Sequence, residues 1–219
     1  MANIFQLSWQ VPFGVFSFNI DPLSVIFLMA IGILTACTTS YGFGYMRAYQ
    51  GKKSLALHVF FYFLLILALI LVVTANNVIL FLSAWEMMTI SAYFLIIFND
   101  EEKSVRQAGF LYLIASHGAT FFLFVMFFVM AHIAHSMDFH LMAGTTFSPA
   151  IAGTVFLLAL IGFGVKAGFL PLHIWLPRAH PAAPSHVSAV MSGVMIKMGI
   201  YGLLRMLTML GPPPAWWGW

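Results

Sequence analysis

The sequence predicts an all-α integral membrane protein of about six transmembrane helices. Of its 219 residues, 62% are hydrophobic and only 7% are charged, whereas about a quarter of the residues in a soluble domain carry charge. Six stretches reach the roughly 20 mostly apolar residues that are needed to cross a bilayer. They are continuously apolar and lack the two-residue alternation of a membrane β-barrel. We therefore expect a single membrane domain over residues 1–219, with no separate soluble domain.

The expected helices follow one another through short connections. In chain order they cover residues 22–46, 55–75, 78–98, 108–134, 150–176 and 187–210. The stretch from His135 to Pro149 is polar and rich in turn-forming residues, which predicts a loop there. Three prolines follow Gly211 and cannot continue a helix, so the last span ends before them.

Basic residues gather in alternate connections and predict the orientation of the chain. Six of the nine Lys and Arg residues lie between the first and second, third and fourth, and fifth and sixth helices. They are Arg47, Lys52, Lys53, Lys103, Arg106 and Arg178. By the positive-inside rule these connections are cytoplasmic, and both termini are expected outside.

Several functional classes are excluded or disfavoured by the composition. A net charge of +3 in so apolar a chain does not support nucleic-acid binding. Cys37 is the only cysteine, so we expect no disulfide framework, iron–sulfur cluster or structural zinc site. No Lys or Arg precedes the first apolar stretch, so a secretory signal peptide is not expected.

Three charged residues fall near the middle of the predicted spans: Glu86, Lys166 and Lys197. A charge at the bilayer centre costs about 3 to more than 10 kcal/mol, so such residues face a bundle interior, pair with one another or line a wet path. A structural ion pair between Glu86 and one lysine would leave the other lysine unpaired, which favours a proton-transfer role. Arg205 lies near a helix end, where we expect it to reach the membrane surface and to take no part in chemistry.

The fifth predicted helix is expected to break near Lys166. Pro171 lacks an amide donor and clashes with the carbonyl group four residues earlier. Gly164 and Gly168 flank the lysine, either as part of a hinge or as a small-residue surface for close helix packing. Transporters use broken helices at mid-membrane to build ion sites.

The histidines of the sequence can serve as proton relays or as structural residues. His117 alone reaches the middle third of a span, so a haem with two histidine ligands is not expected, and the other histidines fit no standard metal-ligand spacing. We therefore expect no cofactor in the chain. The ordinary pKa of histidine lies near neutral pH and suits proton transfer. Two roles therefore stay open for each of four histidines, proton relay or hydrogen-bonded structural residue: His117, His173, His180 and His186.

Three segments resemble a known family. They are FGVKAGFLPLHIWLPRAHPAAPSHVSAVMSGVMIKMGIYGLLR at 163–205, FNIDPLSVIF at 18–27 and FLSAWEMMTISAYFLI at 81–96. These segments resemble the antiporter-like proton-translocating subunits of respiratory complex I and of membrane-bound NiFe hydrogenases, most closely the formate hydrogenlyase and hydrogenase-4 branch.

The resemblance implies roles for particular residues. It implies that Glu86 pairs with Lys166 on the broken helix, that Lys197 continues a central proton path, and that His180 lies toward the cytoplasmic side. It also implies that the chain has no redox chemistry of its own and belongs to a proton-pumping oxidoreductase in a bacterial or archaeal cytoplasmic membrane. A NiFe centre and iron–sulfur clusters are then expected in peripheral partner subunits.

Members of that family resemble proteins of fourteen helices containing two inverted five-helix repeats. The resemblance implies that the five helices from 55–75 to 187–210 form the first repeat and that 22–46 is the helix before it. We therefore expect a second antiporter-like segment, from another polypeptide or from the remainder of a longer one. Two alternatives remain: a subunit of a multi-subunit Na⁺/H⁺ antiporter, and a structural membrane anchor.

Overall fold

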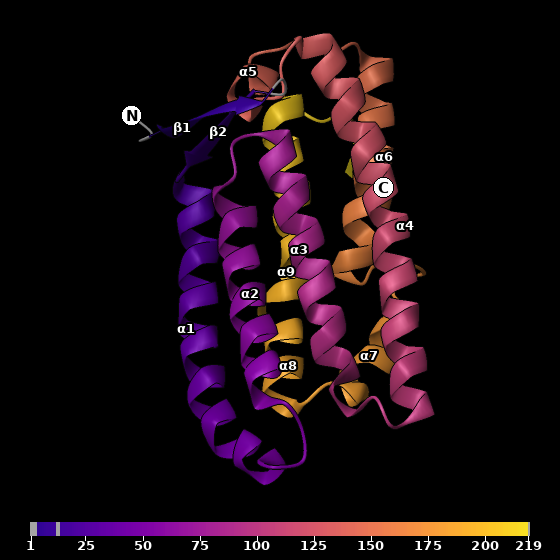
Figure 1. The fold of residues 1–219 in the computed structure, drawn as a ribbon. Helices are drawn as coiled ribbons and strands as arrows, with labels where there is room; N and C mark the ends of the chain where they lie inside the picture. The colour runs from indigo at the N-terminus through magenta and orange to yellow at the C-terminus, as the bar shows by residue number, and fades with distance from the viewer. Residues whose placement is uncertain (1–3, 12–13, 219) are drawn as a thin grey trace.

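Six helical segments that are long and apolar enough to cross a membrane make up most of the computed structural model, which describes residues 4–11 and 14–218 (Figure 1). The prediction of a helical membrane protein with about six spans is confirmed. The spans are Pro22–Tyr49, Leu55–Thr74, Val78–Asn99, Lys103–Ala134, Pro149–Ala167 and Ser185–Leu210.

The elements follow the order of the chain. The strands are β1 (Ile4–Val11) and β2 (Gly14–Asn19), and the helices are α1 (Pro22–Met46), α2 (Leu55–Thr74), α3 (Val78–Ile96), α4 (Lys103–Ala134), α5 (Phe139–Ala143), α6 (Pro149–Ala167), α7 (Leu176–Ala182), α8 (Ser185–Val190) and α9 (Ile196–Leu210). Short 3₁₀ turns occur at Arg47–Tyr49, Ile97–Asn99 and Ala215–Gly218. A π-helical turn, Met191–Met195, joins α8 to α9.

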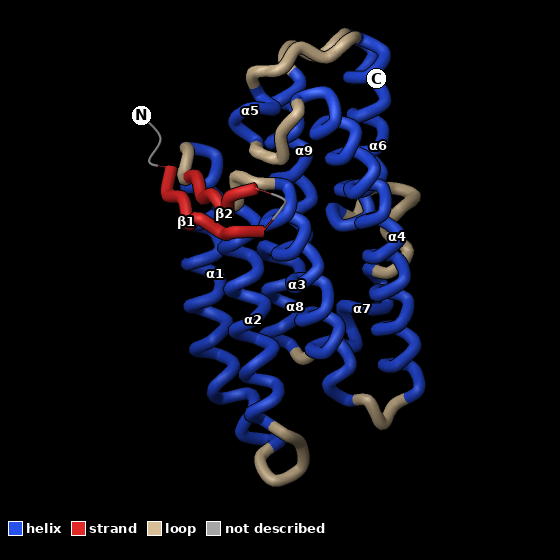
Figure 2. Tube along the Cα trace, turned by 45° about the horizontal axis from the view of Figure 1, so that its top comes forward, coloured by secondary structure: helices blue, strands red, loops and turns tan. Residues whose placement is uncertain are grey.

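An antiparallel β-hairpin precedes the first helix and was not predicted. Strand β1 pairs with β2, with Phe5 opposite Phe18, and Phe18 also bridges to Ala75 in the α2–α3 turn. The neighbouring Asn77 bridges to Asp138 before α5. The hairpin, this turn and α5 therefore lie together at one end of the bundle, the hairpin end (Figures 1 and 2).

The opposite end carries the α1–α2 and α3–α4 connections and helix α7, and we call it the basic-loop end (Figure 1). Lys53 Nζ lies 2.8 Å from Asp100 Oδ1 and 2.9 Å from Glu101 Oε1, so ion pairs join the first two connections. The hydrogen bonds to these carboxylates raise the pKa of Lys53. The alternate connections in which the sequence concentrates basic residues thus share one end of the bundle.

Most predicted helix ends agree with the structure to within two residues. A polar side chain caps the start of α1, α2, α3 and α6: Asp21, Ser54, Asn77 and Ser148 each accept a hydrogen bond from a first-turn amide. Helix α4 begins at Lys103, five residues before the predicted 108. Its first turn is polar and precedes the apolar stretch on which the prediction was based. Its 32 residues span about 48 Å, well beyond a hydrocarbon core of roughly 30 Å.

The predicted fifth span, 150–176, is wrong at its C-terminal end. Helix α6 stops at Ala167 because Gly168 adopts the left-handed conformation, with φ +75°. The amides of Gly168 and Phe169 then donate to the carbonyls of Val165 and Gly164, at 3.3 Å and 2.9 Å. Pro171 lies exposed in the connection that follows, so the break near Lys166 is confirmed and Gly168 is the residue that ends the helix.

Glycines allow α9 to approach α6 closely. A Cβ atom at Gly199 would lie 2.5 Å from the Phe163 carbonyl oxygen and 2.6 Å from the Ala167 amide nitrogen. A Cβ atom at Gly202 would meet the Phe163 ring at 2.3 Å. This contact fixes the position of the end of α6, where Lys166 lies.

Replacing Gly199 by alanine is expected to destabilise the protein by about 1–3 kcal/mol, because the added methyl group meets backbone atoms that cannot rotate away. Thermal unfolding of the detergent-solubilised protein, followed by circular dichroism, would measure the loss. Gly32→Ala on α1 is the matched control, since nothing lies within 4 Å of its added Cβ. An unfolding midpoint for Gly199→Ala at or above the wild-type value would contradict the close contact.

Candidate functional site

Lys166 lies in the last turn of α6 and is 2% exposed. Its Nζ donates hydrogen bonds to Thr89 Oγ1 on α3 at 3.1 Å and to Tyr112 OH on α4 at 2.9 Å. The same nitrogen lies 4.9 Å from the centre of the Tyr112 ring and 5.8 Å from that of Trp85, within reach of cation–π attraction. Three helices therefore enclose the amine.

The partners of Lys166 do not fix its charge. Within the described residues no carboxylate lies within 4.0 Å of its nitrogen. Hydroxyl groups accept hydrogen bonds from an ammonium group and donate them to a neutral amine. Both protonation states of Lys166 can therefore be hydrogen-bonded in this site, whereas a carboxylate partner would hold the lysine charged.

Glu86 pairs with a histidine. On α3, Glu86 Oε2 lies 2.9 Å from His117 Nδ1 on α4, and the exposed fractions of the two side chains are 24% and 47%. A carboxylate beside an imidazole can share a proton in either direction. The resemblance implied an ion pair between Glu86 and Lys166. Among the described residues, Lys166 Nζ lies farther than 4.0 Å from the Glu86 carboxylate, and His117 is the partner of Glu86 instead.

Two buried oxygen atoms lie on α3 and α4, the helices that carry the Glu86–His117 pair and the hydroxyl partners of Lys166. Glu86 and Thr89 lie one turn apart on α3. On α4, Ser116 lies one turn after Tyr112 and next to His117. Glu86 Oε1 and Ser116 Oγ are buried and make no hydrogen bond to any described residue. Buried polar atoms of this kind are usually satisfied by water, which can link groups that do not touch.

Lys197 lies apart from Lys166. Although α9 packs closely on α6, the side chain of Lys197 is exposed on the bundle surface, and its Nζ donates to the Ser192 carbonyl oxygen at 2.6 Å. Ser192 belongs to the π-helical turn that precedes α9. The predicted site residues therefore divide into a buried group around Lys166 and an exposed lysine on the last span.

The remaining predicted histidines gather at the break and at the basic-loop end. His173 lies in the α6–α7 connection with its Nδ1 buried and unpaired within the described residues. His180 Nδ1, on α7, lies 3.0 Å from Ser188 Oγ, and burial lowers the pKa of this imidazole. His186 Nε2, on α8, lies 2.8 Å from His58 Nε2. No described contact links these three to Lys166.

Gly164 serves the broken helix rather than a helix–helix contact. A Cβ atom there would lie 3.2 Å from Phe169 and 3.4 Å from Leu172, both in the connection after α6. Trp175 is fully buried beneath this connection and donates from Nε1 to the Val165 carbonyl oxygen at 2.8 Å. The connection therefore folds back onto the turn that carries Lys166.

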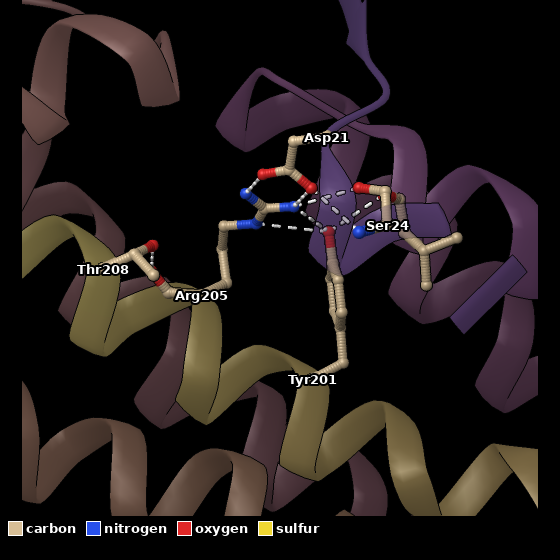
Figure 3. A network of polar contacts seen from close by, with 6 residues as sticks. Asp21, Ser24, Tyr201, Arg205 and Thr208 are labelled. Carbon is tan, nitrogen blue, oxygen red and sulfur yellow. Dashed lines mark hydrogen bonds and ion pairs between the residues drawn. The ribbon is translucent and has the colours of Figure 1, made fainter. Parts of the chain in front are cut away.

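Arg205 lies near the hairpin end and forms an ion pair there. Its guanidinium turns inward and pairs with both oxygens of Asp21, the residue that caps α1 (Figure 3). It also donates to Ser24 Oγ at 3.0 Å and to Tyr201 OH at 2.8 Å. Ser24 and Tyr201 both donate to the Val73 carbonyl oxygen. This network joins α1, α2 and α9 near the hairpin end.

Sequence reasoning missed the groups that hold the candidate residues. Thr89, Tyr112, Asp21 and His58 were not among the candidate residues. A signal existed for the histidine pair, because His58 and His186 lie close to the same ends of their predicted spans. Nothing in the sequence marked Thr89 or Tyr112 as partners of a lysine 54 or more residues away.

The chain is similar to several membrane subunits. Residues 75–217 match the family described as NADH:quinone oxidoreductase/Mrp antiporter, transmembrane. Hydrogenase-4 component B of Escherichia coli K12 is 40% identical over 94% of this chain and 31% of its own length. An NAD(P)H-quinone oxidoreductase chain 4 of Microcystis aeruginosa is 30% identical over 91% of this chain and 34% of its own. The chain thus spans about a third of the length of these curated relatives.

A solved structure shares the fold. A chain of the Mrp complex from Dietzia superposes with a TM-score of 0.82 at 22% identity, covering 94% of this chain and 23% of the other.

Proposed function

Because this chain belongs to the NADH:quinone oxidoreductase/Mrp antiporter family, we propose that it is a proton-translocating membrane subunit, or part of one, of a membrane-bound hydrogenase or complex-I-like respiratory complex. It couples electron transfer in partner subunits to proton movement. The observation that carries this proposal is Lys166, a fully buried amine held by two hydroxyl groups at the end of a broken helix.

The proposed path begins at Glu86 and His117 and passes to Lys166 through water. The unpaired Glu86 Oε1 and Ser116 Oγ supply hydrogen-bonding positions for that water. A change in the charge of the Glu86–His117 pair changes the energy of a proton on Lys166. The work of moving one proton against 100 mV is about 2.3 kcal/mol, which the switching of a nearby charge can supply.

Lys197 supports the presence of a further protein segment. An ammonium group on a span surface would cost about 3 to more than 10 kcal/mol if it faced hydrocarbon at mid-membrane. Its exposure here is therefore explained if a second antiporter-like repeat covers it, from another polypeptide or from the remainder of this one. In the proposal Lys197 passes protons from Lys166 toward that repeat.

The other partners follow from the same assignment. Relatives belong to hydrogenase and quinone oxidoreductase systems, so we place a NiFe centre and iron–sulfur clusters in peripheral redox subunits and no cofactor in this chain. The lipid bilayer and neighbouring membrane subunits cover the rest of the surface. The basic-loop end faces the cytoplasm of a bacterium or archaeon, and the hairpin end faces outward. His180 and His173 then lie toward the side of proton uptake.

A subunit of a multi-subunit Na⁺/H⁺ antiporter is the second candidate, favoured by the fold shared with the Mrp chain. Such a subunit would use the same buried lysine without a redox partner. The 40% identity to a hydrogenase component favours the first candidate. Nickel and iron measured in the purified native assembly would separate them, because an antiporter assembly would contain neither.

The proposal is tested by proton movement per electron in the intact assembly carrying both Glu86→Gln and Lys166→Met. The expected result is electron transfer with proton movement reduced to background. Unchanged stoichiometry would overturn the proposal and leave the structural anchor as the remaining role. Loss of the assembled complex on a native gel would show instead that these residues hold helices together, which would also count against proton transfer.

A further inference from the structure

Two histidines from different spans meet at the basic-loop end. His58, one turn into α2, and His186, the second residue of α8, are 5% and 3% exposed. Their Nε2 atoms lie 2.8 Å apart, and their ring centres lie 5.0 Å apart in an edge-on arrangement. The Phe98 ring packs edge-on against His58, and Tyr62 and Tyr45 surround His186.

The distance identifies the contact as a hydrogen bond rather than a metal site. Two imidazole ligands on a tetrahedral metal, at about 2.0–2.1 Å each, would hold their nitrogens about 3.3 Å apart. Within residues 4–11 and 14–218, no third His, Cys, Asp or Glu joins the pair as a ligand. Two N–H groups cannot point at each other at 2.8 Å, so one proton is shared between the two Nε2 atoms.

The outer nitrogens of the pair are then of opposite kinds. A neutral imidazole carries one proton, so the ring that donates from Nε2 has a bare Nδ1, and the ring that accepts carries its proton on Nδ1. Both Nδ1 atoms are buried and make no hydrogen bond within the described residues. One end of the pair can therefore take up a proton, and the other end can release one.

Two cavities adjoin the pair. One, of about 280 Å³, is lined by His58 together with Lys53, Ser54 and Asp100 of the basic-loop end. The other, of about 310 Å³, is lined by both histidines. Its other polar lining residues include Tyr62 of α2 and Arg47 at the end of α1. His58 thus lines both cavities, of which the second extends from Arg47 and Gln50 of the α1–α2 connection along the spans to Thr39 and Tyr62.

We propose that His58 and His186 form a second proton-transfer site, which carries protons between the loop surface and the interior of the spans. The inference rests on the proposed function. A proton binds the bare Nδ1 of one ring, the Nε2–H bond of that ring breaks, and its proton crosses 2.8 Å to the partner Nε2. The partner then loses its Nδ1 proton, so the pair gains no net charge.

Gly42 of α1 lies against the His186 ring. A Cβ atom at this residue would lie 3.2 Å from Cδ2 of His186. Gly42→Ala therefore displaces the ring without removing a titratable group. Gly44→Ala, two residues along the same helix, is the matched control, since nothing lies within 4 Å of its added Cβ.

The transport test uses the intact assembly in inverted membrane vesicles, with His58→Gln, His186→Gln and the double variant. Glutamine keeps a hydrogen-bonding side chain but does not exchange a proton at neutral pH. Each single variant is expected to slow proton movement about a hundredfold, within the usual range for a lost proton-transfer group, and the double variant no further. Gly42→Ala is expected to lower transport. Gly44→Ala, and His132→Gln at an exposed histidine in the last turn of α4, are expected to leave it unchanged. Wild-type transport in both single variants, or additive losses, would overturn the inference.

The same vesicles separate this inference from the proposed function. If Lys166→Met stops transport while the histidine variants transport normally, the relay is overturned and the proposed function stands. If Lys166→Met changes nothing, the proposed function fails, and the relay fails with it.

A spectroscopic measurement distinguishes a relay from a structural pair or a metal site. In the full chain labelled with ¹⁵N-histidine in lipid nanodiscs, the two Nε2 nuclei should show scalar coupling through the shared proton, and the Nδ1 proton should exchange with solvent. Coupling without exchange would overturn the relay and indicate a structural pair. A change of both signals on addition of Zn²⁺ alone would overturn it in favour of a metal site.

Discussion

Replacing Lys166 by methionine is expected to lower proton movement per electron about a hundredfold, within the range that a lost proton-transfer group costs. Methionine matches the length of the lysine stem and is readily buried, so the fold should survive. Its thioether cannot carry a proton between the Thr89 and Tyr112 hydroxyls. A pH-sensitive dye in inverted vesicles, read together with the rate of electron transfer, measures the ratio.

Lys166→Arg separates charge from proton exchange. A guanidinium stays protonated at any accessible pH, so this variant keeps the positive charge but cannot release the proton. We expect it to fail as fully as the methionine variant. Lys52→Met, at an exposed loop lysine, is the control and should transport normally. Normal transport by Lys166→Arg would mean that Lys166 acts only as a fixed charge.

Replacing Arg205 by glutamine is expected to destabilise the protein by about 3 kcal/mol, because it leaves the partly buried Asp21 carboxylate without its partner. The unfolding midpoint in detergent measures the effect. The double variant Asp21→Asn with Arg205→Gln should recover at least half of the loss, because neither charge is then left alone. Lys53→Gln removes two ion pairs with exposed carboxylates and should leave the midpoint unchanged. Equal midpoints for Arg205→Gln and the wild type would contradict a stabilising network.

The same ion pair predicts a pH dependence. Partial burial would raise the pKa of Asp21, but hydrogen bonds from Arg205 and the Ser24 amide outweigh it and lower this pKa from 3.8 to about 2. A carboxyl group whose pKa is lower in the folded state stabilises the fold above its unfolded value of 3.8. That contribution disappears as the pH falls through about 2. The Arg205→Gln variant should lose most of this dependence between pH 4 and pH 2.

The spans were predictable because membrane thickness sets the length of an apolar stretch, and five of the six expected ranges overlap the observed spans closely. The C-terminal end of α6 was not predictable, because apolar residues continue in the sequence past Gly168, where the backbone turns and the helix ends. The hairpin before α1 was not predicted, because bridges to residues far along the chain, at Ala75 and Asn76, hold it in place.

The cost of burying charge identified Glu86, Lys166 and Lys197, but it could not identify their neighbours. In a membrane helix the lipid-facing and protein-facing sides are both apolar, so periodicity does not reveal which side points inward. Sequence therefore indicated the depth of each residue and left its rotation about the helix axis open. That rotation turns Lys166 toward two hydroxyl groups, Lys197 to the surface and Arg205 toward Asp21.

The pairing of Asp21 with Arg205 also bears on how the chain is assembled in the membrane. The two residues lie 184 positions apart, so at about 5–20 residues per second the acid is synthesised roughly 10–40 s before its partner. Until α9 is inserted, Asp21 is left at the membrane surface without this cation. A ribosome that stalls before Arg205, or a chain truncated there, would leave α1 tethered only by its neighbours. The ion pair can therefore form only after α9 has been inserted.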